Sequence, residues 1–231
     1  MITVKSKLYI TSTPIGNYDD ITLRALETLK KVDFVICEEY KEARRLLSHY
    51  GIEKELISMN EHNEGEVAEE ILTRLTKENL QAALISDCGT PLFSDPGKLL
   101  IKLCIQNEIE IIPLPGANSL ITALMGAGLN LDRFYFYGWL SPKKEIRSKE
   151  LNQLRGTREV IAIMETPYRL LRLLEDILNV FGPGIQCVLA YELTSPGELF
   201  LRGKISEIFK TAQEKHLKGE FVLLVDNSRR N

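Results

Sequence analysis

The first half of the chain alternates between short apolar runs and amphipathic stretches. The apolar runs lie at residues 8–12, 34–37, 56–59, 82–86 and 109–113. Their length is typical of buried strands. Between them, pairs such as Ala25 and Leu29, or Ile71 and Leu75, recur four residues apart, as on one face of a helix. Asp20 precedes the first amphipathic stretch and is its expected N-cap. This alternation predicts parallel strands joined by right-handed helical crossovers.

The second half has a different pattern. Apolar or aromatic runs at residues 134–139, 160–164, 186–193, 198–202 and 221–225 predict further strands. The triplet Ser195-Pro196-Gly197 separates two of them and indicates a hairpin. Leu170, Leu174 and Phe181 share one face of a predicted helix, and Pro115-Gly116 precedes another apolar helix. A hairpin combined with helices indicates a mixed, partly antiparallel sheet.

These patterns predict a two-domain α/β protein. We expect residues 1–117 to form an N-terminal domain with a parallel sheet and flanking helices. Residues 118–231 should form a C-terminal domain with a mixed sheet and helices. Ligand sites commonly lie between domains, so the cleft between these two is the expected binding site.

Composition is that of an ordinary globular protein, with 231 residues, 44% hydrophobic and 26% charged. No apolar run is long enough to cross a membrane, and the first residues lack a signal-peptide pattern. A cytoplasmic protein is therefore expected. The four cysteines are Cys37, Cys88, Cys104 and Cys187. They show no C-x-x-C spacing and are interpreted as reduced thiols, so no metal site is expected. His49, His62 and His216 lie in polar surroundings and are expected at the surface.

Charge is unevenly distributed, although the formal net charge is only -3. Residues 53–70 contain seven glutamates against one lysine, whereas residues 141–158 contain six lysines and arginines against two glutamates. A basic segment of this kind can contact RNA phosphates even on an acidic protein. Lys143, Lys144 and Arg147 are the candidate RNA-binding residues. The alternative is a solvated helix face.

The loop after the fourth apolar run has the strongest chemical pattern. It places Asp87, Thr90 and Asp95 after a predicted strand, together with Gly89 and Pro91. In open α/β sheets, ligands bind at the carboxyl ends of strands. Glycine allows close approach of a ligand, and proline stiffens the loop. A hydrated crossover loop is the alternative interpretation.

Residues 86–97 resemble the S-D-x-G-T-P-x-x-S-D-P-G signature of the tetrapyrrole-methylase-like superfamily of S-adenosylmethionine-dependent methyltransferases. Three further stretches resemble the branch that contains the small-subunit ribosomal RNA 2′-O-methyltransferases. Residues 13–22 are similar to its T-P-I-G-N-x-x-D-I-T, residues 113–117 to its P-x-P-G turn, and residues 190–194 to its A-R-E-L-T. The four motifs occur in the family's order.

The resemblance implies S-adenosylmethionine as cofactor, S-adenosylhomocysteine as product, and a homodimer. The implied acceptor is the 2′-hydroxyl of a cytidine in 16S ribosomal RNA, on the RNA or the small ribosomal subunit. The implied cofactor-binding residues are Pro14, Gly16, Asp87, Gly89, Thr90, Pro91, Phe93, Ser94, Asp95, Ala117, Asn118, Ser119, Ala190 and Glu192.

Two departures from the family pattern concern the acceptor. Residues 38–41 are Glu-Glu-Tyr-Lys, where the family usually has E-D-T-R, and the sequence stops where the ribosomal enzymes usually continue into a small helical domain. Residues 164–169 resemble the family's Y-E-x-x-H-R, with Tyr168 at the usual histidine. Glu165, Glu39 and Arg169 are the candidate catalytic residues, with a glutamate as general base.

Two other functions stay open at this point. The acceptor could be a tetrapyrrole ring carbon, of the uroporphyrinogen or precorrin type, as in other members of the superfamily. Alternatively, the protein could bind S-adenosylmethionine without catalysis, which the departure at residues 38–41 would allow. No G-x-G-x-x-G, P-loop, H-E-x-x-H or G-x-S-x-G motif is present, so the common dinucleotide, phosphate, zinc-protease and hydrolase signatures are absent from the sequence.

Overall fold

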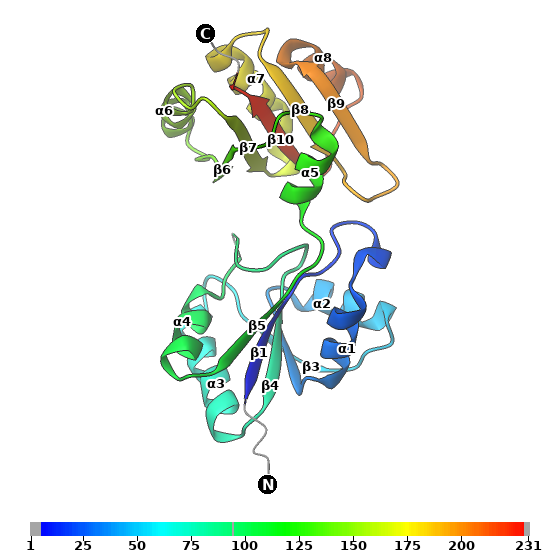
Figure 1. The fold of residues 1–231 in the computed structure, drawn as a ribbon, viewed down its shortest axis with the longest axis vertical. Helices are drawn as coiled ribbons and strands as arrows, with labels where there is room; N and C mark the ends of the chain where they lie inside the picture. Colours follow the sequence, from blue (N-terminus) through cyan, green and yellow to red (C-terminus); the bar gives the residue numbers. More distant parts are fainter. Residues whose placement is uncertain (1–5, 94, 229–231) are drawn as a thin grey trace. The chain divides into compact units, whose positions relative to one another are not determined.

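The computed structural model describes residues 6–93 and 95–228. The chain divides into two compact units, Met1–Asn118 and Ser119–Asn231 (Figure 1). Each contains one sheet of five strands.

Unit 1 is built on a fully parallel sheet. Its strands lie in the order β3-β2-β4-β1-β5 and pair in parallel throughout. They are β1 (Lys7–Thr11), β2 (Phe34–Cys37), β3 (Glu55–Ser58), β4 (Gln81–Ile85) and β5 (Glu110–Leu114). The predicted parallel sheet is confirmed. Because every strand runs the same way, all five carboxyl ends, and the loops that follow them, lie at one edge.

Helices cover both faces of this sheet. They are α1 (Leu23–Lys31), α2 (Tyr40–His49), α3 (Glu64–Lys77) and α4 (Lys98–Gln106). Alternate residues of β2 face opposite sides: Phe34 packs with Ile71 of α3, whereas Val35 packs with Leu47 of α2. A strand buried on both sides has to be apolar along its whole length, as β2 is.

The first helix begins later than Asp20. Asp20 lies in a short 3-10 turn, η1 (Tyr18–Asp20), and the N-cap of α1 is Thr22. The Thr22 hydroxyl accepts the N–H of Ala25 at 3.1 Å, which satisfies one of the free donors of the first turn. The prediction of Asp20 as N-cap was wrong because Ile21 leaves the turn in an extended conformation and moves the start of the helix to Thr22.

Unit 2 contains a mixed sheet, with strands in the order β6-β7-β10-β8-β9. The strands are β6 (Phe134–Trp139), β7 (Val160–Glu165), β8 (Gln186–Tyr191), β9 (Leu199–Lys204) and β10 (Phe221–Asp226). β6 and β7 are parallel, and β10 is antiparallel to both β7 and β8. β8 and β9 form the predicted antiparallel hairpin. The carboxyl ends of β6, β7 and β8 therefore lie at one edge, together with the start of β10.

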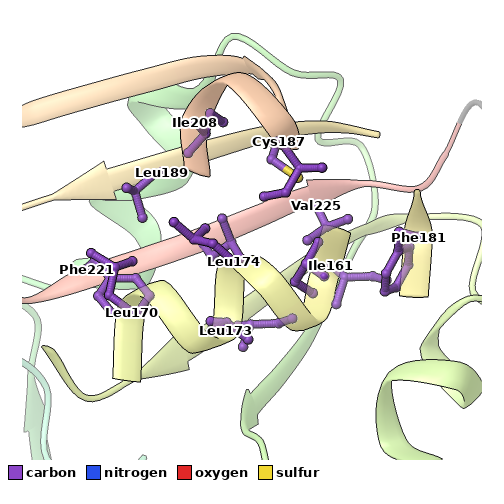
Figure 2. Packing of buried hydrophobic residues seen from close by; sticks show 14 of the residues in the cluster. Ile161, Leu170, Leu173, Leu174, Phe181, Cys187, Leu189, Ile208, Phe221 and Val225 are labelled. Carbon is purple, nitrogen blue, oxygen red and sulfur yellow. The ribbon is translucent and has the colours of Figure 1, made fainter. Parts of the chain in front are cut away.

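Three helices cover one face of this sheet and one helix covers the other. They are α6 (Lys144–Leu154), α7 (Leu170–Phe181) and α8 (Ile205–Glu214) on one face, and α5 (Ser119–Ala127) on the other. Figure 2 shows Leu170, Leu174 and Phe181 of α7 packed against strand residues such as Ile161 and Val225. The predicted face of this helix is thus the core face. Across the described part of the chain, no helix has the length and apolarity needed to cross a bilayer.

Candidate functional site

Hydroxyl groups tie together the loops that follow β1, β4 and β5 in unit 1. Thr13 donates its N–H to the Gly89 carbonyl at 2.8 Å, and its hydroxyl lies 3.3 Å from the same oxygen. The Ser12 hydroxyl donates to Thr90 Oγ1 at 3.3 Å, and Thr90 in turn donates to the carbonyl of Ala117 at 3.1 Å. Three motifs that lie far apart in the sequence thus meet at one edge of the sheet.

Thr90 is the centre of this network. Asn118 Nδ2 donates to Thr90 Oγ1 at 3.1 Å, so Thr90 links residues from all three loops. A Cβ at Gly116 would lie 2.8 Å from Cβ of Ser12, and this close approach explains why the Pro-Gly turn needs a glycine there. Gly89 has φ +81°, a conformation that favours glycine, and its Cβ would meet Ile15 at 3.1 Å.

Several carboxylates gather at the same edge. Asp87 accepts the N–H of Glu39 at 3.2 Å, which brings the end of β2 to the loop after β4. Although Asp87 is exposed, partial desolvation raises its pKa; the hydrogen bond from the Glu39 N–H lowers it, and the negative charges of Glu39 and neighbouring acids raise it. The pKa of Glu38 is raised by burial and, to a smaller extent, by the negative charges of Asp87 and Asp95. The pKa of Asp95 is raised by burial. Repulsion of this kind favours a ligand that carries positive charge.

The edge offers neither a phosphate loop nor a metal cluster. Glu64 Oε1 accepts the N–H groups of Gly97 and Leu99 at 2.9 Å each, so a protein carboxylate fills the anion site at the start of α4. Among residues 6–93 and 95–228, no group of three or more His, Cys, Asp or Glu side chains is arranged to hold a metal ion.

In unit 2, the carboxylate of Glu192 is held rigidly after β8. Glu192 has φ 49°, and its Oε1 accepts the N–H of Glu220 at 2.8 Å. The Ser195 hydroxyl lies 3.3 Å from Oε2. A Cβ on Gly219 would lie only 1.9 Å from Glu192 Oε1, so this position of the carboxylate requires a glycine. Sequence reasoning missed Gly219, which lies two residues before the last predicted strand, residues 221–225.

Glu165 and Arg169 form a second structured group at this edge. Glu165 is 1% exposed, and its Oε2 lies 2.9 Å from the Arg169 guanidinium. Its Oε1 accepts the N–H of Thr166 at 2.9 Å. Arg169 also donates to the carbonyl of Ser141 at 3.2 Å, so the pair holds the turn that follows β6. Both Glu165 oxygens are engaged within the protein, which is an unfavourable arrangement for a general base.

Residues 7–208 match the family model described as Tetrapyrrole (Corrin/Porphyrin) Methylases. The chain belongs to this family. The motif loops that meet around Thr90 are thus the loops of a tetrapyrrole methylase fold, as their resemblance implied.

Two relatives within the family illustrate the similarity. The chain is 38% identical over 224 residues to ribosomal RNA small subunit methyltransferase I of Halalkalibacterium halodurans, a match that covers 97% of this chain and 77% of the relative. It is 42% identical over 221 residues to the protein of the same name from Haemophilus influenzae, covering 95% and 78%. Identity of this level over nearly the whole chain includes both units.

Solved structures with lower identity share the fold. Diphthine synthase aligns with a TM-score of 0.74 at 13% identity, over 96% of this chain and 89% of that one. Uroporphyrin-III C-methyl transferase from Thermus thermophilus, in complex with S-adenyl homocysteine, aligns with a TM-score of 0.64 at 15% identity, over 95% and 96%. The predicted fold class is confirmed.

Arg147 was wrongly predicted to contact RNA. It is 2% exposed, and its Nε donates to Asp176 at 2.6 Å. Its Nη1 donates to the carbonyls of Ser141 and Pro142 at 3.1 and 3.0 Å. Nη2 is buried with no hydrogen-bond partner among the described residues. This guanidinium therefore supports the turn after β6 from inside the protein and does not reach solvent.

The error at Arg147 has a simple cause. Arg147 lies on the same face of α6 as the buried residues Leu151 and Leu154, at helical spacing, so the periodicity placed it on the core face. Lys143 and Lys144, in contrast, are exposed. They stay the candidate RNA contacts of this family member.

The remaining predicted residues are placed as follows. Pro14, Gly89 and Pro91 are buried, Gly16, Asp87 and Phe93 are exposed, and Ser94 lies outside the described residues. Ala190 is buried inside β8, and Ser119 begins α5. Cys37, Cys104 and Cys187 are buried and Cys88 is exposed. The assignment of cofactor-binding roles, and of the cofactor to a cleft between the units, stays a prediction.

Proposed function

We propose that this protein is an S-adenosylmethionine-dependent methyltransferase that modifies small-subunit ribosomal RNA, at the ribose 2′-hydroxyl of a cytidine. One observation carries the proposal: the chain is about 40% identical, over nearly its full length, to proteins named ribosomal RNA small subunit methyltransferase I. A tetrapyrrole acceptor is supported by the description of the family model and by solved structures of 19% and 16% identity, and both are less specific than the named relatives. The proposed enzyme acts in the cytoplasm, and its substrate is the RNA itself or the small ribosomal subunit.

The edge of unit 1 fits the proposed cofactor chemically. S-adenosylmethionine carries a sulfonium and an ammonium group, and when bound it supplies an electrophilic methyl group. Burial raises the pKa of Glu38, Asp87 and Asp95, and negative neighbours raise the pKa of Glu38 and Asp87 further, so a cationic ligand would stabilise their charged forms. The half-buried residues Thr90 and Ala117 lie in loops that add carbonyl oxygens and a stiff backbone. In unit 2, Glu192 offers a carboxylate fixed by two donors.

Within the acceptor site, Glu39 is the preferred candidate for the general base. Its side chain is exposed at the carboxyl edge of unit 1, and its backbone N–H is bonded to Asp87. A base that removes the hydroxyl proton contributes typically about 10²- to 10⁴-fold to rate. Glu165 is buried in its ion pair with Arg169, so we assign these two residues to positioning the turn at Ser141.

We extend the proposal to a homodimer that binds RNA through Lys143 and Lys144. β6 is an edge strand of its sheet, and Phe134, Tyr135 and Trp139 on it are 37%, 44% and 42% exposed. An aromatic edge strand of this kind is a suitable surface for a two-fold contact. A dimer would present two copies of the basic turn to one RNA.

The test is a methylation assay with labelled S-adenosylmethionine and three acceptors: small ribosomal subunits lacking the modification, naked 16S RNA, and uroporphyrinogen. We expect label in RNA, and 2′-O-methylcytidine after digestion and mass spectrometry. The double variant Lys143→Glu, Lys144→Glu should weaken RNA binding while cofactor affinity is retained. The matched double variant Lys210→Glu, Lys215→Glu, at α8 and its C-cap, should bind normally. Label in the porphyrinogen alone would refute the proposal, and light scattering at the mass of one chain would refute the dimer.

A further inference from the structure

A hollow of about 380 Å³ lies between α2 and β3 in unit 1. Its apolar floor includes Leu47 and Ile52, which are 3% and 6% exposed. Its polar lining consists of Tyr40, Arg44, Ser48, Lys54 and one carboxylate, Glu53, which forms no ion pair with Arg44. Pockets of roughly 300 to 1,000 Å³ are typical of small-ligand sites, and the lining of this one is polar as well as apolar. This hollow is therefore large enough for one nucleotide.

This lining combines an aromatic ring with a cation. The guanidinium carbon of Arg44 lies 5.5 Å from the centroid of the Tyr40 ring. The Tyr40 hydroxyl accepts the N–H of Ser58 at 3.2 Å, which fixes the orientation of the ring. Lys54 is tied down, since its Nζ donates to the carbonyl of Val32 at 2.6 Å.

Arg44 has no carboxylate partner within ion-pair distance among residues 6–93 and 95–228, whereas the next residue, Arg45, lies 3.9 Å from Glu42. Arg44 is also exposed at the surface. An exposed guanidinium stacked on an aromatic ring and lacking a carboxylate is available to an anionic group of a ligand. Among nucleic acids, single-stranded RNA is bound in this way, with bases stacked on aromatic or arginine planes and phosphates held by cations.

The hollow begins beside the candidate methyl-transfer chemistry. Tyr40 is the first residue of α2 and follows Glu39, whose N–H is bonded to Asp87. These are the positions at which the sequence departs from the family's E-D-T-R. Here the chain has an aromatic ring at Tyr40 and a guanidinium one helical turn later, at Arg44, on the same face of α2. The departure thus places a stacking surface and a cation next to each other.

We propose that this hollow is a nucleotide subsite for the substrate RNA, in which a base stacks on Tyr40 and Arg44 binds its phosphate. The proposal rests on the proposed function, because it assumes an RNA substrate. It makes Tyr40 and Arg44 determinants of RNA specificity, and it leaves the cofactor site unaffected. An extended peptide added to the free edge of β3 would be the competing occupant.

The experiment measures binding of a fluorescein-labelled single-stranded RNA to the full protein, with cofactor affinity determined in parallel by calorimetry. Loss of one stacked base corresponds to roughly a 5- to 150-fold weaker affinity. We expect a loss in this range for Tyr40→Leu, and a loss for Arg44→Ala together with a salt slope smaller by about 0.7. Arg45→Ala is the matched control and should bind RNA as the wild type does. Cofactor affinity should be unchanged in all three variants.

Tyr40→Phe separates stacking from a structural role. It keeps the ring but loses the hydroxyl that binds Ser58, so it should retain RNA affinity. RNA containing 4-thiouridine should crosslink to residues 40–56. Equal losses for Tyr40→Phe and Tyr40→Leu, crosslinks elsewhere only, or capture of a peptide in place of RNA would overturn the subsite. If the wild type methylates RNA while the Arg44 and Tyr40 variants bind RNA as tightly as Arg45→Ala, the subsite is refuted and the proposed function stands. If the wild type methylates no RNA, the proposed function itself is refuted.

Discussion

Gly219 is the position where one added carbon atom should disturb the candidate site most. In Gly219→Ala, the new Cβ would lie 1.9 Å from Oε1, 2.5 Å from Cδ and 2.6 Å from Cγ of Glu192. The Glu192 side chain has to move, and its hydrogen bond from the N–H of Glu220 is then lost. A hydrogen bond to a charged group contributes about 1.5–3 kcal/mol. Unfolding by urea should show a loss of about this size.

The same displacement should weaken cofactor binding if Glu192 holds the cofactor. The loss of about 1.5–3 kcal/mol corresponds to roughly 10- to 150-fold in affinity for S-adenosylmethionine, measurable by calorimetry. Gly184→Ala is the matched control, because nothing lies within 4 Å of its added carbon. The decisive assay is a double-mutant cycle: in the Glu192→Ala background the contacted atoms are gone, so Gly219→Ala should cost almost nothing. An undiminished loss of stability in that background would refute the reasoning.

Two further predictions concern charges inside the protein. Arg147→Ala leaves the Asp176 carboxylate without its ion-pair partner and should lower the free energy of unfolding by about 3–5 kcal/mol, whereas Lys144→Ala should change it by no more than about 0.5 kcal/mol in the same urea titration. Burial, with repulsion from Asp87, raises the pKa of Glu38 in the folded state, so the native protein binds more protons there than the unfolded chain and stability falls as pH rises through that range. Glu38→Gln should therefore gain stability at neutral pH and gain none well below the ordinary carboxyl pKa; thermal melts showing the same gain at both would contradict this.

The sequence predicts the elements of this fold well, because each depends on local periodicity. The ten strands found among the described residues coincide with apolar runs, and the buried face of α7 follows from Leu170, Leu174 and Phe181. The order of strands in the sheet of unit 2, in contrast, does not depend on local periodicity. β10 lies between β7 and β8 and pairs with residues 30 or more positions earlier in the chain, which no local pattern encodes. The contact of Gly219 with Glu192 depends on that pairing, so the sequence could not reveal it.

The candidate site residues likewise divide into those that a local pattern could predict and those that it could not. The resemblance implied Thr90 and Asn118 as cofactor-binding residues, and the structure brings the two together because each follows a strand of one parallel sheet; their binding role stays a prediction. Counting charge in a segment misplaced Arg147, since the count ignores which face of α6 each residue occupies. The motif around Glu165 indicated catalysis, yet its carboxylate is paired with Arg169 in a buried position. A motif identifies residue types, and only the geometry shows whether their polar atoms are still available.

The charges of the two units show why availability matters more than net charge. Residues 1–118 contain 19 acidic and 13 basic side chains, and residues 119–231 contain 13 acidic and 16 basic ones. By net charge alone, unit 1 would suit a cationic cofactor and unit 2 an RNA phosphate.

Arg44 lies in the acidic unit, where a carboxylate partner would be expected, but it stacks on Tyr40 and has no ion pair among the described residues. In the basic unit 2, by contrast, Arg147 and Arg169 each form an ion pair inside the protein and are not available to a ligand. The net charge of a unit thus includes cations that no ligand can reach, and RNA contacts have to be assigned from the cations that solvent reaches.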